Sequence, residues 1–152
     1  MLKFDNSFYK LRNNFFEEVK PTKMPSPKLV LLNENLARLL NFDKDWLKSQ
    51  NGIDCFSGRK SLKGSKPLSM VYAGHQFGNW VPRLGDGRAI LLGETIDQKK
   101  HRWDIQLKGS GRTPFSRNGD GRATIGPALR EYIISEYMNS INIPTTRALS
   151  VI

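Results

Sequence analysis

A lysine and a glutamate lie on either side of a glycine-rich segment in the second half of the chain. Lys108 ends an alternating, strand-like run, and Glu131 follows within the longest helical pattern. In protein kinases, a strand lysine contacts the phosphates of a nucleotide, and a helix glutamate holds that lysine in place. Lys108 and Glu131 are therefore candidates for an ion pair at a phosphate site.

Two alternatives stay open for this pair. Glu136 competes as a partner for Lys108, but it lies about 140° further around the same helix than Glu131, so both glutamates cannot face one lysine. The other alternative is a plain surface, on which an exposed strand lysine and a solvated helix glutamate do not meet.

The five residues Gly-Asp-Gly-Arg-Ala occur twice, at 85–89 and at 119–123. Glycines let backbone N–H groups approach a phosphate, and Arg88 adds a cation suited to bidentate contact. The second copy precedes a helix, whose N-terminal dipole favours an anion. One copy alone is a common Asp-Gly turn, and neither copy belongs to a GxxxxGK[ST] or GxGxxG motif.

A predicted hairpin positions Lys108. Arg88–Glu94 is apolar on both faces, as in a central strand, and Trp103–Lys108 alternates, so that Lys108 points away from the apolar face. Residues 109–121, with four glycines and a proline, are predicted as a loop.

A helix should follow this loop. It starts near 124–127, where a proline is tolerated, carries a wide apolar stripe and ends at Asn142 and Pro144. A further strand is expected over 145–152, and the chain stops within it.

The first half of the chain is predicted to be less regular. The expected elements are an extension over 1–28, a strand or helix entry over 28–32, a helix capped by Asn33 or Asn35, a helix over 43–50 that stops at Asn51-Gly52, a surface loop over 56–68 and a helix over 69–78. Within the last helix, His75 is predicted to be packed among aromatic side chains rather than catalytic. Cys55 is predicted to be a small, half-buried side chain.

Composition limits the class of protein. The chain has 152 residues, a net charge of +10 and one cysteine. A single cysteine favours a reducing compartment, and no apolar run reaches the roughly 20 residues of a membrane span. The positive charge fits nucleic acid, a membrane surface or a phosphate-bearing ligand. Because the basic residues are dispersed and no RNA-binding signature is present, nucleic acid is disfavoured. A second explanation for the positive charge is that an acidic partner surface lies in a segment outside this chain.

Several motifs resemble the selenoprotein O family in their order and spacing. They are Tyr72–Gly78, Leu84–Ala89, Leu107–Arg117, Gly119–Ala123 and Ile143–Leu149. The resemblance implies a protein-kinase-like fold that binds ATP with Mg or Mn in a flipped orientation. It also implies transfer of AMP to Ser, Thr or Tyr hydroxyls of proteins.

The resemblance also implies roles for individual residues. Lys108 is similar to the family's phosphate-contacting lysine, and Glu131 to its ion-pair partner. The nucleotide contacts that the two loops would supply are Gly85, Gly87, Arg88, Asp120 and Gly121. The family's further phosphate-binding arginines, its catalytic aspartate and its metal-binding Asn and Asp fall beyond residue 152, so no catalytic or metal-binding residue is expected here. The chain departs from many members at Thr124–Pro127, where they carry a more polar, arginine-containing helix start.

The sequence therefore predicts an α+β fold: a kinase-like N-terminal lobe, with an antiparallel sheet, a glycine-rich loop and a C-helix, plus an N-terminal extension. We expect the extension over 1–68 and the nucleotide-binding lobe over 69–152, truncated at its C-terminal end. The expected function is ATP binding within a cytoplasmic protein adenylyltransferase, with little or no transfer by this chain alone. The alternatives are a non-catalytic nucleotide-binding or protein-interaction module and a basic nucleic-acid binder. An exposed apolar face could drive self-association.

Overall fold

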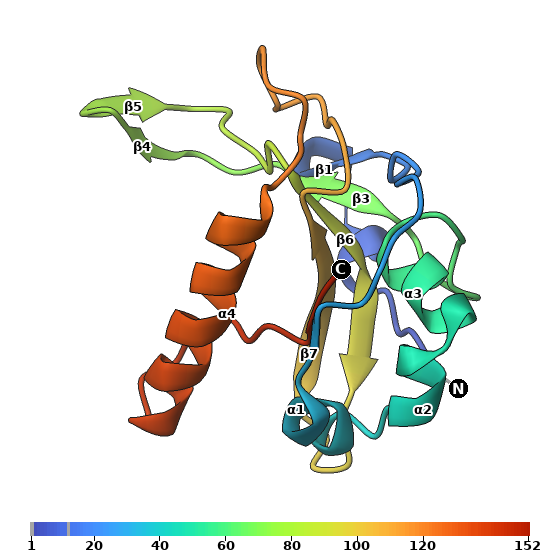
Figure 1. Ribbon diagram of the computed structural model, residues 1–152. Helices are drawn as coiled ribbons and strands as arrows, with labels where there is room; N and C mark the ends of the chain where they lie inside the picture. The colour runs from blue at the N-terminus through green and yellow to red at the C-terminus, as the bar shows by residue number, and fades with distance from the viewer. Residues whose placement is uncertain (1, 12) are drawn as a thin grey trace.

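The computed structural model describes residues 2–11 and 13–152, and it has the expected α+β class. One four-stranded, antiparallel sheet forms its centre, in the order β1-β3-β6-β7. Figure 1 shows β6 and β7 as the long strands of this sheet. The four strands are β1 (Phe16–Glu18), β3 (Leu68–Met70), β6 (Ala89–Ile96) and β7 (Arg102–Lys108).

The hairpin of β6 and β7 confirms the predicted one. β6 lies between β3 and β7, and its consecutive residues 90–95 are all buried, because both faces of this central strand are covered. In β7, Ile105 and Leu107 are buried, whereas Asp104, Gln106 and Lys108 on the other face are exposed. The alternation of apolar and polar residues therefore predicted correctly which side chains of β7 are buried and which are exposed.

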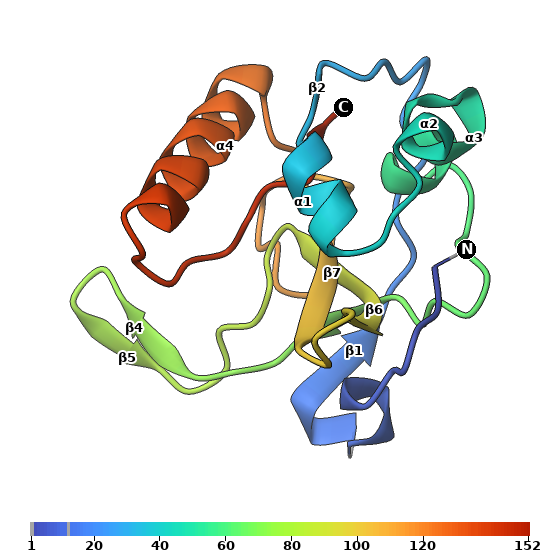
Figure 2. The ribbon, with the colours of Figure 1, turned by 90° about the horizontal axis from the view of Figure 1, so that it is seen from below.

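Helices lie on both sides of this hairpin. Figures 1 and 2 show α2 and α3 on one side of β6 and β7 and α4 on the other. The side with α3 holds the main apolar core, in which side chains from α1, α3 and the 57–67 loop meet those of β6 and β7. Its buried members are Leu36, Leu40, Cys55, Leu62, Leu92, Ile105 and Leu107. Lys108 and the exposed face of β7 point to the opposite side.

The short helices begin close to where they were predicted, with Asn33 the cap of the first, but they do not all end as predicted. Asn33 caps α1 (Glu34–Leu39), and Asp43 caps α2 (Lys44–Lys48). The predicted stop at Asn51-Gly52 is wrong, because Ser49 caps a further helix, α3 (Gln50–Phe56). A Cβ at Gly52 would overlap the Trp46 carbonyl, so the glycine allows the two helices to approach closely.

The N-terminal segment packs on the sheet. Two 3-10 helices, η1 (Phe8–Lys10) and η2 (Asn13–Phe15), precede β1, which pairs with β3. The buried carboxylate of Glu94 in β6 accepts hydrogen bonds from the Phe8 N–H, at 2.8 Å, and from the Ser7 hydroxyl. The described residues up to 68 thus share a sheet and a core with the following part, and a domain boundary at 68/69 stays a prediction.

The helix predicted over 69–78 is wrong. Residues 68–70 form β3, and β4 (Gly74–Gln76) and β5 (Asn79–Val81) form a separate two-stranded hairpin that projects from the sheet in Figure 1. Phe77 and Gly78 have φ of 53° and 78°, which suits a two-residue hairpin turn. His75 meets the Trp80 ring edge-on, which agrees with the predicted aromatic contact, but it is exposed, and its structural rather than catalytic role stays a prediction.

The last elements place α4 (Ile125–Ser140) at the edge of the molecule. None of its residues is buried, and it stands apart from the sheet in both ribbon views. The predicted final strand is limited to β8 (Ser150–Val151), which pairs with β2 (Leu31–Leu32). No helix among the described residues is long and apolar enough to cross a membrane.

Candidate functional site

Lys108 and Glu131 meet on the open side of β7. Lys108 Nζ donates to Glu131 Oε2 at 2.7 Å, and about half of each side chain is exposed. Glu136 points elsewhere and holds Arg147 through two hydrogen bonds of 2.6 Å each. The structure therefore selects Glu131 over Glu136 as the partner of Lys108, and the two side chains are not separately solvated.

Arg88, in the loop just before the neighbouring strand β6, joins this pair. Ala89 pairs with Lys108 in the hairpin register, and the Gly109 N–H donates to the Arg88 carbonyl at 2.8 Å. Arg88 Nη2 lies 3.9 Å from Glu131 Oε1. Two cations and one carboxylate are thus gathered at the end of β7, with a net positive charge.

The first glycine-rich loop is held against the segment after β7. Gly85 has φ of +71°, and a Cβ there would overlap the Phe115 ring, so both the conformation and the contact require glycine. Asp86 accepts hydrogen bonds from the Tyr72 hydroxyl at 3.0 Å and the Met70 N–H at 3.3 Å. The loop is therefore fixed on two sides.

Burial perturbs the two polar groups behind this loop. Removal from water raises the pKa of the Asp86 carboxyl, although the hydrogen bonds from Tyr72 and Met70 oppose that shift. Burial, together with the nearby Asp86 charge, raises the pKa of Tyr72 to about 12. Tyr72 thus stays protonated at neutral pH and can donate to Asp86.

The second glycine-rich loop lies against the residues that follow Lys108. Ser110 and Arg122 form an isolated antiparallel bridge, and the Gly111 N–H donates to the Gly121 carbonyl at 3.2 Å. A Cβ on Gly121 would overlap the Gly111 carbonyl. The Asp120 carboxylate accepts from the Arg122 N–H at 2.9 Å and is otherwise exposed. Both loops therefore flank the end of β7.

Sequence reasoning missed the residues that support the first loop. Thr113 and Ser116 donate hydrogen bonds to its carbonyls, and Asp86 and Tyr72 brace it from behind. The signal available was the Thr-Pro-Phe-Ser run inside a glycine-rich loop, because short hydroxyl side chains in turns often bond to nearby backbone groups.

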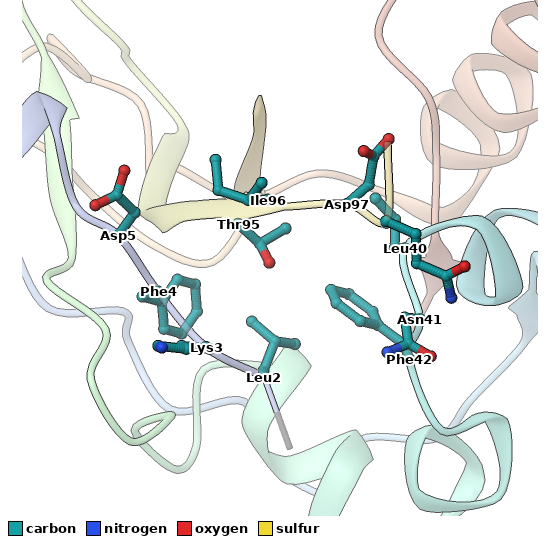
Figure 3. Close-up of a pocket in the computed structure, with 11 residues that line it drawn as sticks. Leu2, Lys3, Phe4, Asp5, Leu40, Asn41, Phe42, Thr95, Ile96 and Asp97 are labelled. Carbon is teal, nitrogen blue, oxygen red and sulfur yellow. The ribbon is translucent and has the colours of Figure 1, made fainter. Parts of the chain in front are cut away.

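One hollow on the described residues lies away from this cluster. It has a volume of about 530 Å³ and is bordered by the N-terminal segment, the end of α1 and the turn after β6. Figure 3 shows Phe4, Phe42 and Thr95 around it, with Asp5 and Asp97 at its edge. The turn after β6 is roughly 20 Å along β7 from Lys108. The carboxylates of Asp5 and Asp97 at the edge of the hollow do not suit a phosphate.

The cluster at Lys108 suits an anion rather than a metal ion. Fixed cations and glycine-rich backbone are the groups that bind phosphates in proteins. Within the described part of the chain, no three His, Cys, Asp or Glu side chains gather in a way that could hold a metal ion. The Mg or Mn expected with ATP stays a prediction.

Comparison with known proteins gives a consistent match over the whole chain. A family model described as "Protein adenylyltransferase SelO" matches residues 1–152. Curated relatives, each called "Protein nucleotidyltransferase YdiU", are 58% identical in Methylorubrum populi, 57% in Rhodopseudomonas palustris strain BisB5 and 54% in Alkalilimnicola ehrlichii. Each match covers 149 residues, which is 98% of this chain and 30% of the relative.

Proposed function

The chain belongs to the SelO family of protein nucleotidyltransferases, and from this premise we propose that residues 1–152 form its ATP-binding N-terminal lobe. The observation that carries the proposal is the meeting of Lys108, Glu131 and Arg88 at the end of β7. In this assignment Glu131 orients the Lys108 ammonium, and Lys108 and Arg88 contact phosphate oxygens.

The arrangement of elements supports a kinase-like lobe. The antiparallel sheet carries Lys108 on a strand, a glycine-rich loop precedes the neighbouring strand β6, and a single long helix, α4, supplies Glu131. These are the parts that position a nucleotide in protein kinases. The Asp120–Gly121 turn adds a second loop beside the lysine, and we assign Gly85, Gly87, Asp120 and Gly121 to nucleotide contact.

The proposed reaction of full-length members is transfer of AMP from ATP to Ser, Thr or Tyr hydroxyls of proteins. The chain spans about 30% of the length of the curated relatives it matches, so this activity belongs to the whole protein. Attack on an α-phosphate requires stabilisation of negative charge, which Lys108, Arg88 and backbone N–H groups would provide. A bound Mg or Mn would neutralise further phosphate charge. We expect residues 1–152 alone to transfer no AMP.

Calorimetric titration with Mg-ATP tests the binding function. The wild-type chain should give a saturable binding isotherm, and Lys108→Ala should weaken binding at least tenfold because it removes a phosphate-contacting cation. Lys99→Ala, at the opposite end of the same hairpin, is the matched control and should bind as the wild type does. Equal affinities for Lys108→Ala and Lys99→Ala would refute the assignment.

The same titration separates the competing functions. A basic nucleic-acid binder would bind mixed-sequence oligonucleotides with an affinity that falls steeply with salt. Its titration with Mg-ATP would be the same for the wild type and for Lys108→Ala. A non-catalytic module would bind Mg-ATP. In that case a full-length relative incubated with α-labelled ATP would transfer no label to protein.

A further inference from the structure

The carbonyl groups of the first glycine-rich loop are turned toward one short segment, residues 113–116. Thr113 Oγ1 donates to the Asp86 carbonyl at 2.6 Å, and Ser116 Oγ donates to the Gly87 carbonyl at 2.6 Å. Ser69 Oγ donates to the same Asp86 carbonyl at 3.0 Å. Two successive peptide groups therefore have a fixed direction.

Peptide geometry determines where the N–H groups of these units point. In a trans peptide, the C=O of one residue and the N–H of the next are antiparallel. Because the Asp86 and Gly87 carbonyls face residues 113–116, the N–H groups of Gly87 and Arg88 point away from that segment. Neither N–H has a hydrogen-bond acceptor within residues 2–11 and 13–152.

The supporting segment is itself well fixed. Each hydroxyl that donates to the loop also accepts a hydrogen bond within the segment: Ser116 Oγ from the Thr113 N–H at 2.8 Å, and Thr113 Oγ1 from the Phe115 N–H at 3.1 Å. Thr113 is buried, and the Phe115 ring fills the space beneath Gly85. The Asp86 carbonyl would keep its hydrogen bond from Ser69 if Thr113 rotated away, whereas rotation of the Ser116 hydroxyl would remove the hydrogen bond to the Gly87 carbonyl, which is costly.

The free N–H groups belong to the two residues just before β6, where Ala89 pairs with Lys108. Arg88 carries one of them, and its side chain is 3.9 Å from Glu131, which holds Lys108. Two neutral donors beside two cations suit an anion with several oxygens, such as a phosphate.

We propose that Thr113 and Ser116 are positioning residues that orient the Gly87 and Arg88 N–H groups toward a phosphate of the bound nucleotide. Neither hydroxyl touches the nucleotide; both act through the loop. This inference rests on the proposed function, since it assigns a support to that same site.

The test measures Mg-ATP affinity and backbone signals in variants that differ by one hydroxyl. Ser116→Ala removes the donor to Gly87, and Ser65→Ala is its matched control, because Ser65 is another half-buried serine that donates to a loop carbonyl, that of Leu62, at 2.8 Å. Thr113→Val removes the other hydroxyl at nearly constant shape, and Thr113→Ser retains it. Thermal unfolding of each variant reports changes in the fold.

Ser116→Ala and Thr113→Val should each bind Mg-ATP about five- to tenfold more weakly, which corresponds to one oriented hydrogen bond. Thr113→Ser and Ser65→Ala should bind as the wild type does. In amide NMR spectra, the Gly87 and Arg88 signals should move downfield when Mg-ATP is added to the wild type, and this movement should be lost in Ser116→Ala while the spectrum stays dispersed.

Two results would overturn the inference in distinguishable ways. If the wild type binds Mg-ATP, Lys108→Ala does not, and Ser116→Ala and Thr113→Val bind normally with unchanged Gly87 and Arg88 signals, the positioning role is wrong and the proposed function stands. If the wild type does not bind Mg-ATP, both the positioning role and the proposed function are wrong. A loss of affinity in Ser116→Ala matched by an equal loss in Ser65→Ala would reduce the effect to general destabilisation and would also refute the role.

Discussion

Lys108 Nζ and Glu131 Oε2 lie 2.7 Å apart, so one charged hydrogen bond joins the last residue of β7 to α4. About half of each side chain is exposed. Ion pairs that are this exposed contribute only about 0–1 kcal/mol to folding. The pair is thus better suited to orienting an ammonium group than to holding the fold together.

Replacement of the glutamate should separate ligand binding from stability. Glu131→Gln is expected to weaken Mg-ATP binding about tenfold, because the Lys108 ammonium loses its charged partner, and to change the free energy of unfolding by less than about 1 kcal/mol. Calorimetry and chemical denaturation measure the two effects. Glu136→Gln on the same helix is the control and should leave Mg-ATP affinity unchanged; equal loss of affinity in both variants would contradict the assignment.

The Glu136–Arg147 pair should instead stabilise the fold in a pH-dependent way. The hydrogen bond from Arg147 lowers the pKa of Glu136 below its ordinary value, 4.5. Such a group stabilises the folded state above its unfolded pKa, and that contribution is lost as the pH falls through the lower folded pKa. Only 12% of the Arg147 side chain and 25% of the Glu136 side chain are exposed, so Glu136→Gln should cost about 2 kcal/mol at pH 7 and much less near pH 3.

Denaturation of both proteins from pH 7 to pH 3 measures this difference. Other carboxylates titrate equally in the wild type and in Glu136→Gln, so the gap between the two curves isolates Glu136. A gap that stays constant with pH would show that the pair's charge does not contribute to stability.

Gly85 in the first glycine-rich loop and Gly78 in the β4–β5 turn separate the cost of a left-handed backbone from the cost of a steric contact. Gly85 and Gly78 have φ of +71° and +78°, but only Gly85 has a side chain, Phe115, where a Cβ would lie; Gly78 has no atom within 4 Å. Gly78→Ala should cost about 1 kcal/mol for the left-handed conformation alone. Gly85→Ala should cost roughly 2 kcal/mol more, because the Phe115 ring must move. Equal losses of unfolding free energy would rule out close packing of Phe115 on the loop.

The exposed apolar surface of α4 should make the chain associate with itself. Ile133, Ile134 and Tyr137 are 57–61% exposed, and large apolar patches favour association. Sedimentation equilibrium should show a concentration-dependent mass for the wild type and a monomer for Ile134→Lys. Ile96→Lys, at an exposed isoleucine at the end of β6, is the control and should associate like the wild type.

Local patterns predicted the parts of the fold that depend on neighbouring residues. Alternation in 103–108 assigned the faces of β7, and Asn33 was one of the two residues predicted to cap α1. The 69–78 segment was misread because an apolar, aromatic run fits a helix or strands equally well. The segment becomes a hairpin because Phe77 and Gly78 adopt positive φ values, and the periodicity of the sequence does not indicate such a turn.

The sequence predicted the charged residues of the site but not the residues that hold its first glycine-rich loop in place. The pattern of a strand lysine and a helix glutamate left Glu131 and Glu136 as alternatives, and the family resemblance pointed to Glu131, the partner that the structure contains. The contact of this pair with nucleotide stays a prediction. Thr113 and Ser116 were missed because their hydrogen bonds join segments 27 and 29 residues apart, and such contacts depend on the tertiary fold.

Labelling of Lys108 by an acyl-phosphate derivative of ATP tests the central claim most directly, because the reagent acylates lysines that lie beside a bound phosphate chain. Mass spectrometry of the peptides should show Lys108 labelled in preference to Lys99 and Lys100, the lysines at the far turn of the same hairpin, and an excess of Mg-ATP should suppress the Lys108 label. Labelling of Lys108 no stronger than that of Lys99 and Lys100, or insensitive to Mg-ATP, would contradict its assignment to the nucleotide phosphates.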